Sequence, residues 1–287
     1  MNIKRESATI TCRDRVRLGV TIFEPNVAPK GTVLVCAALG VPQRFYKPFC
    51  LFLSDNGFVT ITFDYRGTGE SRNGAPRGKD IRFTDWGTLD IEAAIGYALD
   101  MKNGPVFVIG HSAGGQLFGL APRSEHIRGA VLAPASSANW RLYPAPFRYA
   151  LYMIWHLLIP AVSVGRNTFP AKMLGLSSMN VPRGAIEDWA GFARLPDYFF
   201  SENSGVDTRR FAELGIPILA YAFDDDAYAS ENAVDHLLSR FRRADIEKHF
   251  ISAKTLGKGS IGHFGFFKKK MADTLWPQTL DWLLARL

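Results

Sequence analysis

Short apolar runs separated by helix-period segments recur along most of the chain. Alternating residues at 8–12 and 16–23, joined by a turn near Arg13 and Asp14, predict an antiparallel hairpin at the start. Continuous apolar runs predict buried strands at 32–37, 59–63, 106–109, 130–133, 216–223 and 246–251. Helix-period segments occur at 83–101, 231–241 and 272–284. This alternation predicts an α/β fold with a mostly parallel central sheet and helices on both faces.

One stretch, from 136 to about 210, breaks this pattern. It contains proline-interrupted helical pieces, no good strand and many large aromatic side chains. We expect a helical cap at 136–210, inserted into a core formed by 1–135 and 211–287. Most of these aromatic side chains should bury the cap against the core. Those that face inwards, with Trp155 and Phe192 as candidates, would line an apolar pocket.

The composition narrows the class of protein. A chain of 287 residues with 47% apolar residues can bury the core of one large domain. The net charge of +7 comes from 34 basic and 27 acidic residues, and no basic motif interleaved with aromatic residues indicates nucleic-acid binding. The most apolar stretch, 149–164, is interrupted by His156 and Pro160 and is short for a transmembrane helix. This apolar stretch is compatible with weak contact with a membrane surface.

Cysteine usage and the first residues point to a compartment. Cys12, Cys36 and Cys50 are odd in number and lack metal-ligand spacing, so we interpret them as reduced, structural thiols. Residues 1–7 carry charges and no apolar segment of a secretory signal. We therefore expect a cytoplasmic protein, and we expect no metal and no other cofactor.

The most informative motif is the hexapeptide GHSAGG at 110–115, which directly follows the apolar run 106–109. A serine on a sharp turn between a buried strand and a helix, with glycines two before and two after it, is typical of a catalytic nucleophile. Ser112 is therefore the candidate nucleophile. The turn aims the backbone N–H of Ala113 at the point where an oxyanion would form, and we assign the second donor to the backbone N–H of Leu39.

A serine nucleophile needs a base, and the base needs an acid that orients it. Of six histidines, His263 lies in a glycine-flanked loop after the last predicted strand, where it can reach over the strand ends. We interpret His263 as the base, and the alternative is a structural histidine that caps a loop. The side chain of His111, beside the serine, should point away from the hydroxyl.

The acid is expected at the end of a strand that lies between the serine and the histidine in the chain. The predicted strand 216–223 ends in Asp224, Asp225 and Asp226. We assign Asp226, which best matches a position that reaches the histidine loop. Asp224 and Asp225 are the alternatives, and their other role would be to cap a turn or to face solvent.

These features together resemble the α/β-hydrolase family, and within it the branch that contains monoacylglycerol lipases and serine aminopeptidases, above all bacterial predicted hydrolases of that branch. The resemblance covers nearly the whole chain outside 136–210. It rests on the elbow, the loops of Asp226 and His263, the pair Phe45-Tyr46 and the segment DYRGTGES at 64–71.

The resemblance also implies a structural role for one segment, and this chain departs from the family pattern at two places. It implies that 64–71 is a structural turn in which Asp64 and Arg66 satisfy buried backbone groups. Family members commonly carry His-Gly at the oxyanion loop, where this chain has Ala37-Ala38, and before the acid, where it has Ala222-Phe223.

We therefore expect a serine hydrolase that cleaves a small-molecule carboxylic ester with an apolar acyl or alkyl part through an acyl-enzyme. Amide cleavage of the aminopeptidase type and acyl transfer use the same triad and are alternatives. The carboxylates at 136–210 are dispersed, however, and do not form the cluster that would hold a free amine. A catalytically silent hydrolase fold that binds a ligand is a further alternative, and the filled triad positions argue against it.

Overall fold

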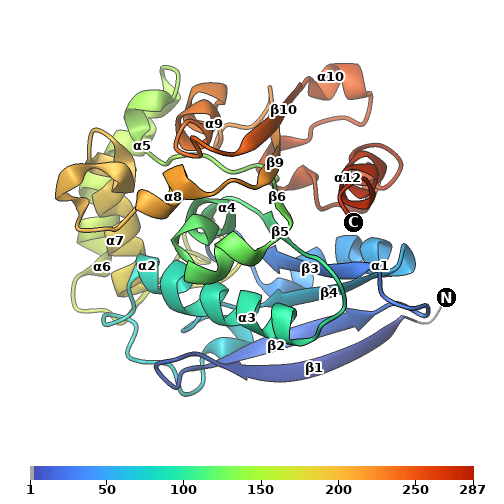
Figure 1. Ribbon diagram of the computed structural model, residues 1–287. Coiled ribbons are helices and arrows are strands. Elements are labelled where there is room, and N and C mark those ends of the chain that lie inside the picture. Colours follow the sequence, from blue (N-terminus) through green and yellow to red (C-terminus); the bar gives the residue numbers. More distant parts are fainter. Residues whose placement is uncertain (1–2) are drawn as a thin grey trace.

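The computed structural model describes residues 3–287 and contains an eight-stranded sheet in the order β1-β2-β4-β3-β5-β6-β9-β10 (Figure 1). β1 pairs antiparallel with β2, and β2 with β4, whereas the other neighbours are parallel. The strands are β1 (Lys4–Thr11), β2 (Arg17–Glu24), β3 (Gly31–Cys36), β4 (Phe58–Phe63), β5 (Val106–Gly110), β6 (Gly129–Leu132), β9 (Pro217–Phe223) and β10 (Asp245–Ile251). The predicted fold class is confirmed, and each predicted strand is present, although β1 begins at Lys4, four residues before the predicted 8–12.

The burial of the strands explains why their sequences differ. Every residue of β3, β4, β5 and β6 is buried, as expected for parallel strands that are covered on both faces. The edge strands β1 and β10 are largely exposed or half-buried, and they carry charged side chains. Charges on an edge strand discourage pairing with another chain.

Helices cover both faces of the sheet (Figure 1). α1 (Lys47–Asp55) and α12 (Leu275–Leu284) pack together on one face, where Phe52 contacts Trp276. The other face carries α3, α4 and α9 (Figure 1). The remaining core elements are η1 (Gln43–Tyr46), η2 (Gly69–Ser71), α2 (Phe83–Asp85), η3 (Trp86–Ile91), α3 (Glu92–Asp100), α4 (Ala113–Leu117), η4 (Phe118–Leu120), η5 (Pro122–His126), α8 (Arg209–Glu213), α9 (Glu231–Leu238), α10 (Ala253–Leu256), α11 (Gly262–Gly265) and η10 (Lys269–Met271).

The stretch between β6 and β9 is mainly helical, and it lies at the left of the molecule in Figure 1. It also contains a short antiparallel pair, β7 and β8, in which Thr168 faces Pro182 and Phe169 faces Val181. No strand was expected here, and two residues are too few to give a periodic signal. The elements are η6 (Trp140–Leu142), α5 (Phe147–Met153), η7 (Ile154–Leu158), α6 (Ile159–Ser163), β7 (Thr168–Phe169), β8 (Val181–Pro182), α7 (Arg183–Arg194), η8 (Tyr198–Phe200) and η9 (Glu202–Ser204).

The turn at 64–71 is held by Asp64, as the resemblance implied. One carboxylate oxygen of Asp64 accepts from the amide of Gln43 at 2.9 Å and the other from the amide of Glu70 at 3.0 Å. The implied role of Arg66 is wrong. Its guanidinium donates to carboxylates instead of backbone carbonyls, to Asp90 and Asp14 at 2.6 Å each.

The ion pair between Arg66 and Asp90 lies in the protein interior. The side chain of Arg66 is 2% exposed and that of Asp90 is 0% exposed. Asp90 also accepts from the amide of Arg66 at 2.8 Å, so one carboxylate fixes both the side chain and the backbone of the turn. Burial raises the pKa of Asp90 to about 7, although the guanidinium favours the ionised form.

We predict that Arg66→Met lowers the free energy of unfolding by about 3–5 kcal/mol at pH 8, because it leaves the buried carboxylate of Asp90 without a counterion. The loss should shrink as the pH falls, since the orphaned carboxyl can then be buried in its neutral form. Urea denaturation measures both effects. The matched control is Arg77→Met, which removes a surface pair with Asp80 and should cost less than about 1 kcal/mol. Equal losses in the two variants would contradict the argument.

Candidate active site

Ser112 lies on a strained turn between β5 and α4. Its backbone has φ 49° and ψ −114°, a conformation that L-residues rarely adopt and that concentrates at functional sites. A Cβ on Gly110 would approach the Cα of Gly115 to 2.5 Å, and a Cβ on Gly114 would approach the carbonyl oxygen of Cys36 to 2.2 Å. Only glycine fits at these two positions, so the motif follows from the close approach of α4 to β3 and β5.

His263 and Asp226 are hydrogen-bonded to each other. His263 Nδ1 lies 2.9 Å from Asp226 Oδ2, and the two side chains are 7% and 0% exposed. Asp226 Oδ1 also accepts from the amides of Tyr228 at 2.8 Å and Ala229 at 3.1 Å. With Nδ1 donating to the carboxylate, the other ring nitrogen, Nε2, carries the free lone pair. His263 lies in the short helix α11, a helical turn within the predicted loop.

The three consecutive aspartates have different partners. Asp224 accepts from the amide of Ala253 at 2.9 Å, and its hydrogen bonds to Ser252 and Ala253 lower its pKa. Asp225 accepts from the hydroxyl of Ser260 at 2.7 Å and from the amides of residues 261 and 262 at 2.8 Å each. Asp226 is the member of the trio that bonds to His263, while Asp225 holds the chain just before His263.

The oxyanion loop is fixed by a chain of hydrogen bonds through His111. The amide of Ala38 donates to the hydroxyl of Tyr46 at 2.8 Å, and this hydroxyl lies 2.8 Å from His111 Nδ1. His111 Nε2 lies 2.9 Å from the carbonyl oxygen of His263. The side chain of His111 thus bonds to Tyr46 and to the backbone of His263. Burial, together with His263, holds the pKa of His111 well below its ordinary value, so the ring is neutral.

Leu39 and Ala113 are the backbone donors assigned from the sequence. The amide of Ala38 is used by Tyr46, and the amide of Leu39 has no hydrogen-bond partner within residues 3–287. Ala113 is the first residue of α4, so its N–H is one of the amides that a helix leaves without an internal partner. Ser112 and Leu39 line the same cavity.

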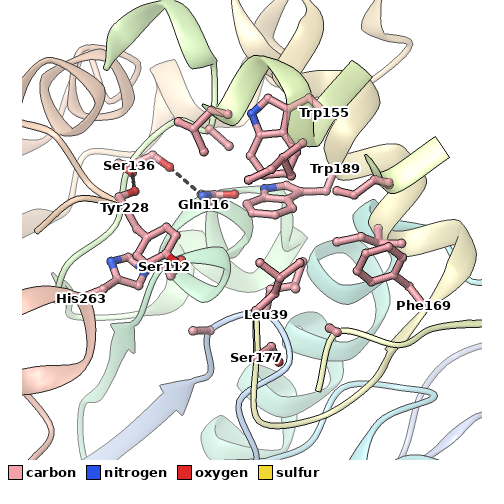
Figure 2. Close-up of a pocket in the computed structure, with 18 of the residues that line it drawn as sticks. Leu39, Ser112, Gln116, Ser136, Trp155, Phe169, Ser177, Trp189, Tyr228 and His263 are labelled. Atoms are coloured by element: carbon pink, nitrogen blue, oxygen red, sulfur yellow. Dashed lines mark hydrogen bonds between the residues drawn. The ribbon is translucent and has the colours of Figure 1, made fainter. Parts of the chain in front are cut away.

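The cavity beside Ser112 has a volume of about 110 Å³ and is mostly apolar (Figure 2). Figure 2 shows Ser112 and His263 on one side and Trp155, Trp189 and Phe169 on the other. The lining comprises Ala38, Leu39, Ser112, Gln116, Ser136, Ala138, Tyr143, Leu151, Ile154, Trp155, Ile159, Phe169, Ala171, Leu176, Ser177, Ile186, Trp189, Tyr228, His263 and Phe264.

The side-chain amide of Gln116, which also lines the cavity, is already hydrogen-bonded. Its Nε2 donates to the carbonyl of Ser136 at 2.6 Å, and its Oε1 accepts from the hydroxyl of Tyr198 at 2.7 Å. Of the two aromatic side chains expected to line the pocket, only one does so. Trp155 lines the cavity, whereas Phe192 is outside the lining and packs against Tyr198 and Phe199.

A second serine, histidine and aspartate also lie close together. His236 Nδ1 is 2.7 Å from Ser137 Oγ, and His236 Nε2 is 2.7 Å from Asp197 Oδ1. Ser137 is 0% exposed and outside the lining of the cavity, and Arg240 binds the same carboxylate at 2.6 Å. This group therefore links two segments to α9, the one that carries Ser137 and the one that carries Asp197. Its serine is not accessible to a substrate.

Sequence reasoning missed one contributor to this geometry and gave another only in general terms. Tyr46 enters only as part of the resemblance, and its hydroxyl reaches both the oxyanion loop and the elbow. For Asp225 the capping role is the correct alternative, and its three hydrogen bonds cap the loop of the histidine, which the sequence did not specify. Gly262 directly before His263 was a usable signal, because a carboxylate often caps the exposed amides of such a turn.

Comparison with known proteins decides the family. The model of the "Alpha/beta hydrolase family" matches residues 33–267. The chain belongs to this family. A search of curated proteins gives no match.

Several solved structures share the fold of this family member. A monoglyceride lipase from Saccharomyces cerevisiae, solved as a soluble variant with a substrate analogue, has a TM-score of 0.66 at 16% identity, with 100% of this chain and 95% of that chain covered. A carboxyl esterase from Bacillus coagulans has a TM-score of 0.65 at 14% identity and 99% coverage of both chains. An esterase from Pyrococcus furiosus has a TM-score of 0.61 at 16% identity, with 99% and 93% covered. At these identities the similarity concerns the fold.

Neither a metal cluster nor a membrane-spanning helix occurs in the part of the chain that the structure describes. Within residues 3–287, no group of three or more His, Cys, Asp or Glu side chains is arranged to hold a metal ion. In the same part of the chain, no helix combines the length and the apolar character needed to cross a membrane.

Proposed function

We propose that this α/β hydrolase is a serine hydrolase that cleaves carboxylic esters with an apolar acyl or alkyl part through an acyl-enzyme. The observation that carries the proposal is that His263, which is hydrogen-bonded to Asp226, lines the same cavity as Ser112. We assign Ser112 as the nucleophile, His263 as the base and Asp226 as the acid that orients the imidazole.

The proposed chemistry follows from the free lone pair on His263 Nε2. This nitrogen takes the proton of Ser112 as the serine Oγ attacks the ester carbonyl, and the amides of Leu39 and Ala113 donate to the oxyanion that forms. His263 then gives the proton to the leaving alcohol, and water repeats the sequence on the acyl-enzyme. The buried carboxylate of Asp226 stabilises the imidazolium that forms in each half of the reaction.

The cavity supports an ester substrate over a peptide. Within the described chain its lining contains no aspartate or glutamate that would bind a free amino group, and its walls are largely aliphatic and aromatic. We therefore propose the monoacylglycerol lipase-like side of the branch and not the aminopeptidase-like side.

We also propose that residues 136–210 form a cap over a core of 1–135 and 211–287. Support comes from the cavity, whose lining combines Ser112 of the core with Trp155 and Trp189 of this stretch. The three cysteines are free and buried, which supports the proposal of a reducing, cytoplasmic location.

The decisive experiment tests the nucleophile. Ser112→Ala should abolish labelling by a fluorophosphonate and lower turnover of a nitrophenyl ester by about 10⁴- to 10⁶-fold, because nucleophile and base act as a unit. The matched control is Ser177→Ala, which removes another serine from the cavity lining and should retain labelling. Labelling that persists in Ser112→Ala would overturn the proposal.

The three aspartates should differ in their effect on turnover. Asp226→Asn should lower kcat by about 10⁴-fold, since an amide no longer holds the imidazole in the working tautomer. Asp224→Asn should cost little, and Asp225→Asn should cost an intermediate amount because it loosens the turn before His263. Steady-state kinetics of the three variants, with circular dichroism as the check on folding, measure this order. A loss in Asp224→Asn that matched Asp226→Asn would move the acid to Asp224.

Trp155 should set the preference for acyl chain length. Trp155→Ala enlarges the cavity and should shift the ratio of kcat/KM between long and short acyl esters by about 1–3 kcal/mol. Phe192→Ala is the matched control, since it truncates an aromatic side chain of the same segment outside the cavity. A nitrophenyl ester series measures both variants. A uniform change for all esters in Trp155→Ala would count against a pocket at this place.

A further inference from the structure

The helical segment α5-η7-α6 has large apolar side chains on its outer side as well as on its inner side. The inner residues Leu151, Trp155 and Ile159 are buried and line the cavity. On the outer side Tyr149, Tyr152, Met153, Leu157 and Val164 are 54%, 40%, 51%, 55% and 73% exposed. We call these five side chains the outer face. A helix that is apolar all round is ordinarily buried in a protein or in lipid.

The spacing places four of these five side chains on one side of the helix, and Val164 directly follows its end. Tyr149, Met153 and Leu157 follow one another at intervals of four residues, and Tyr152 lies beside them, so they share one side of the helix. The segment lies at the edge of the molecule in Figure 1, away from α1 and α12. Apolar patches of this kind on a soluble protein mark an interaction surface.

The charged residues that precede and follow the outer face in the sequence have one sign. Between Glu125 and Glu187 the sequence contains no aspartate or glutamate. The same stretch carries Arg128, Arg141, Arg148, Arg166, Lys172 and Arg183. Arg148 immediately precedes the outer face, and the exposed Arg166 follows it by two residues. The apolar surface is thus flanked by cations at both ends.

We propose that the outer face docks on the headgroup region of a bilayer that contains anionic lipids. Each Lys or Arg side chain near such a surface strengthens binding by about fivefold, and apolar side chains enter the boundary of the acyl chains. Tyrosines such as Tyr149 and Tyr152 suit the interface, where the ring is buried and the hydroxyl stays wet. The segment 147–163 is about 25 Å long as a helix, so it lies along the surface.

The charge pattern disfavours a second copy of the chain as the occupant. In a two-fold dimer the same patch faces itself, which would bring Arg148 and Arg166 of both copies together without a carboxylate between Glu125 and Glu187 to separate them. An anionic lipid surface neutralises these cations instead.

Docking on a membrane does not depend on the proposed hydrolase activity, but one consequence of docking rests on that proposal. The inner side of the same helix lines the cavity, so a docked molecule would hold the cavity next to the bilayer. Together with the proposed ester hydrolysis, this arrangement would supply apolar esters from the membrane.

The test is co-sedimentation of the full chain with vesicles of phosphatidylcholine alone or mixed with phosphatidylglycerol. We expect binding to the mixed vesicles that weakens with added salt. Leu157→Glu and Met153→Glu should lower the partition coefficient by about tenfold or more, and Arg166→Ala by about fivefold. The matched controls are Phe250→Glu on β10 and Val27→Glu, two exposed apolar positions elsewhere, together with Arg243→Ala.

The outcomes separate this proposal from its rivals and from the proposed function. Wild-type protein that stays in the supernatant, or equal losses in Phe250→Glu and Leu157→Glu, would overturn docking. A dimer in analytical ultracentrifugation that Leu157→Glu dissociates would assign the face to a second copy. Ser112→Ala should still bind vesicles, and Leu157→Glu should still react with a fluorophosphonate in solution. These two results keep the membrane question and the catalytic question apart.

Discussion

Three segments of the candidate site depend on the buried imidazole of His111. The ring accepts from Tyr46 at Nδ1 and donates from Nε2 to the backbone of His263. Such a ring must be neutral, with one nitrogen as donor and the other as acceptor, and burial keeps it so. A single side chain next to Ser112 therefore sets the distance between the elbow, the oxyanion loop and the helix of the base. Because the hydroxyl of Tyr46 donates to His111, its oxygen can accept from the amide of Ala38. The amide of Leu39 is then the next one in the loop that is free to donate to an oxyanion.

The parts of the fold that were predictable are those encoded by neighbouring residues. Strands such as 106–109 appear as short apolar runs because both faces of a parallel sheet are buried. The elbow is visible because its glycines are forced by backbone contacts within and next to the motif. The order of nucleophile, acid and histidine along the chain then directed attention to Asp226 and His263, which the fold brings together.

The parts that were not predictable depend on partners far apart in the chain. The counterion of Arg66 is Asp90 on η3, and no sequence pattern near either residue predicts this ion pair. Phe192 and Trp155 belong to the same aromatic-rich stretch, and only the packing of η7 and α7 decides which one reaches the cavity. The hydrogen bonds of Asp225 also depend on a loop that returns after two helices and a strand.

The turn after β9 has an architectural consequence. Asp225 accepts hydrogen bonds from the chain at 260–262, and Asp226 accepts one from the imidazole of the next residue. Two adjacent carboxylates therefore fix the backbone of this loop and the side chain of its histidine. The position of the imidazole is thus set by the turn after β9, where the amides of Tyr228 and Ala229 also hold Asp226. Among the described residues, helix α9, the edge strand β10 and helix α10 make no hydrogen bond to the imidazole of His263, so a change in their length would leave both of its anchors in place.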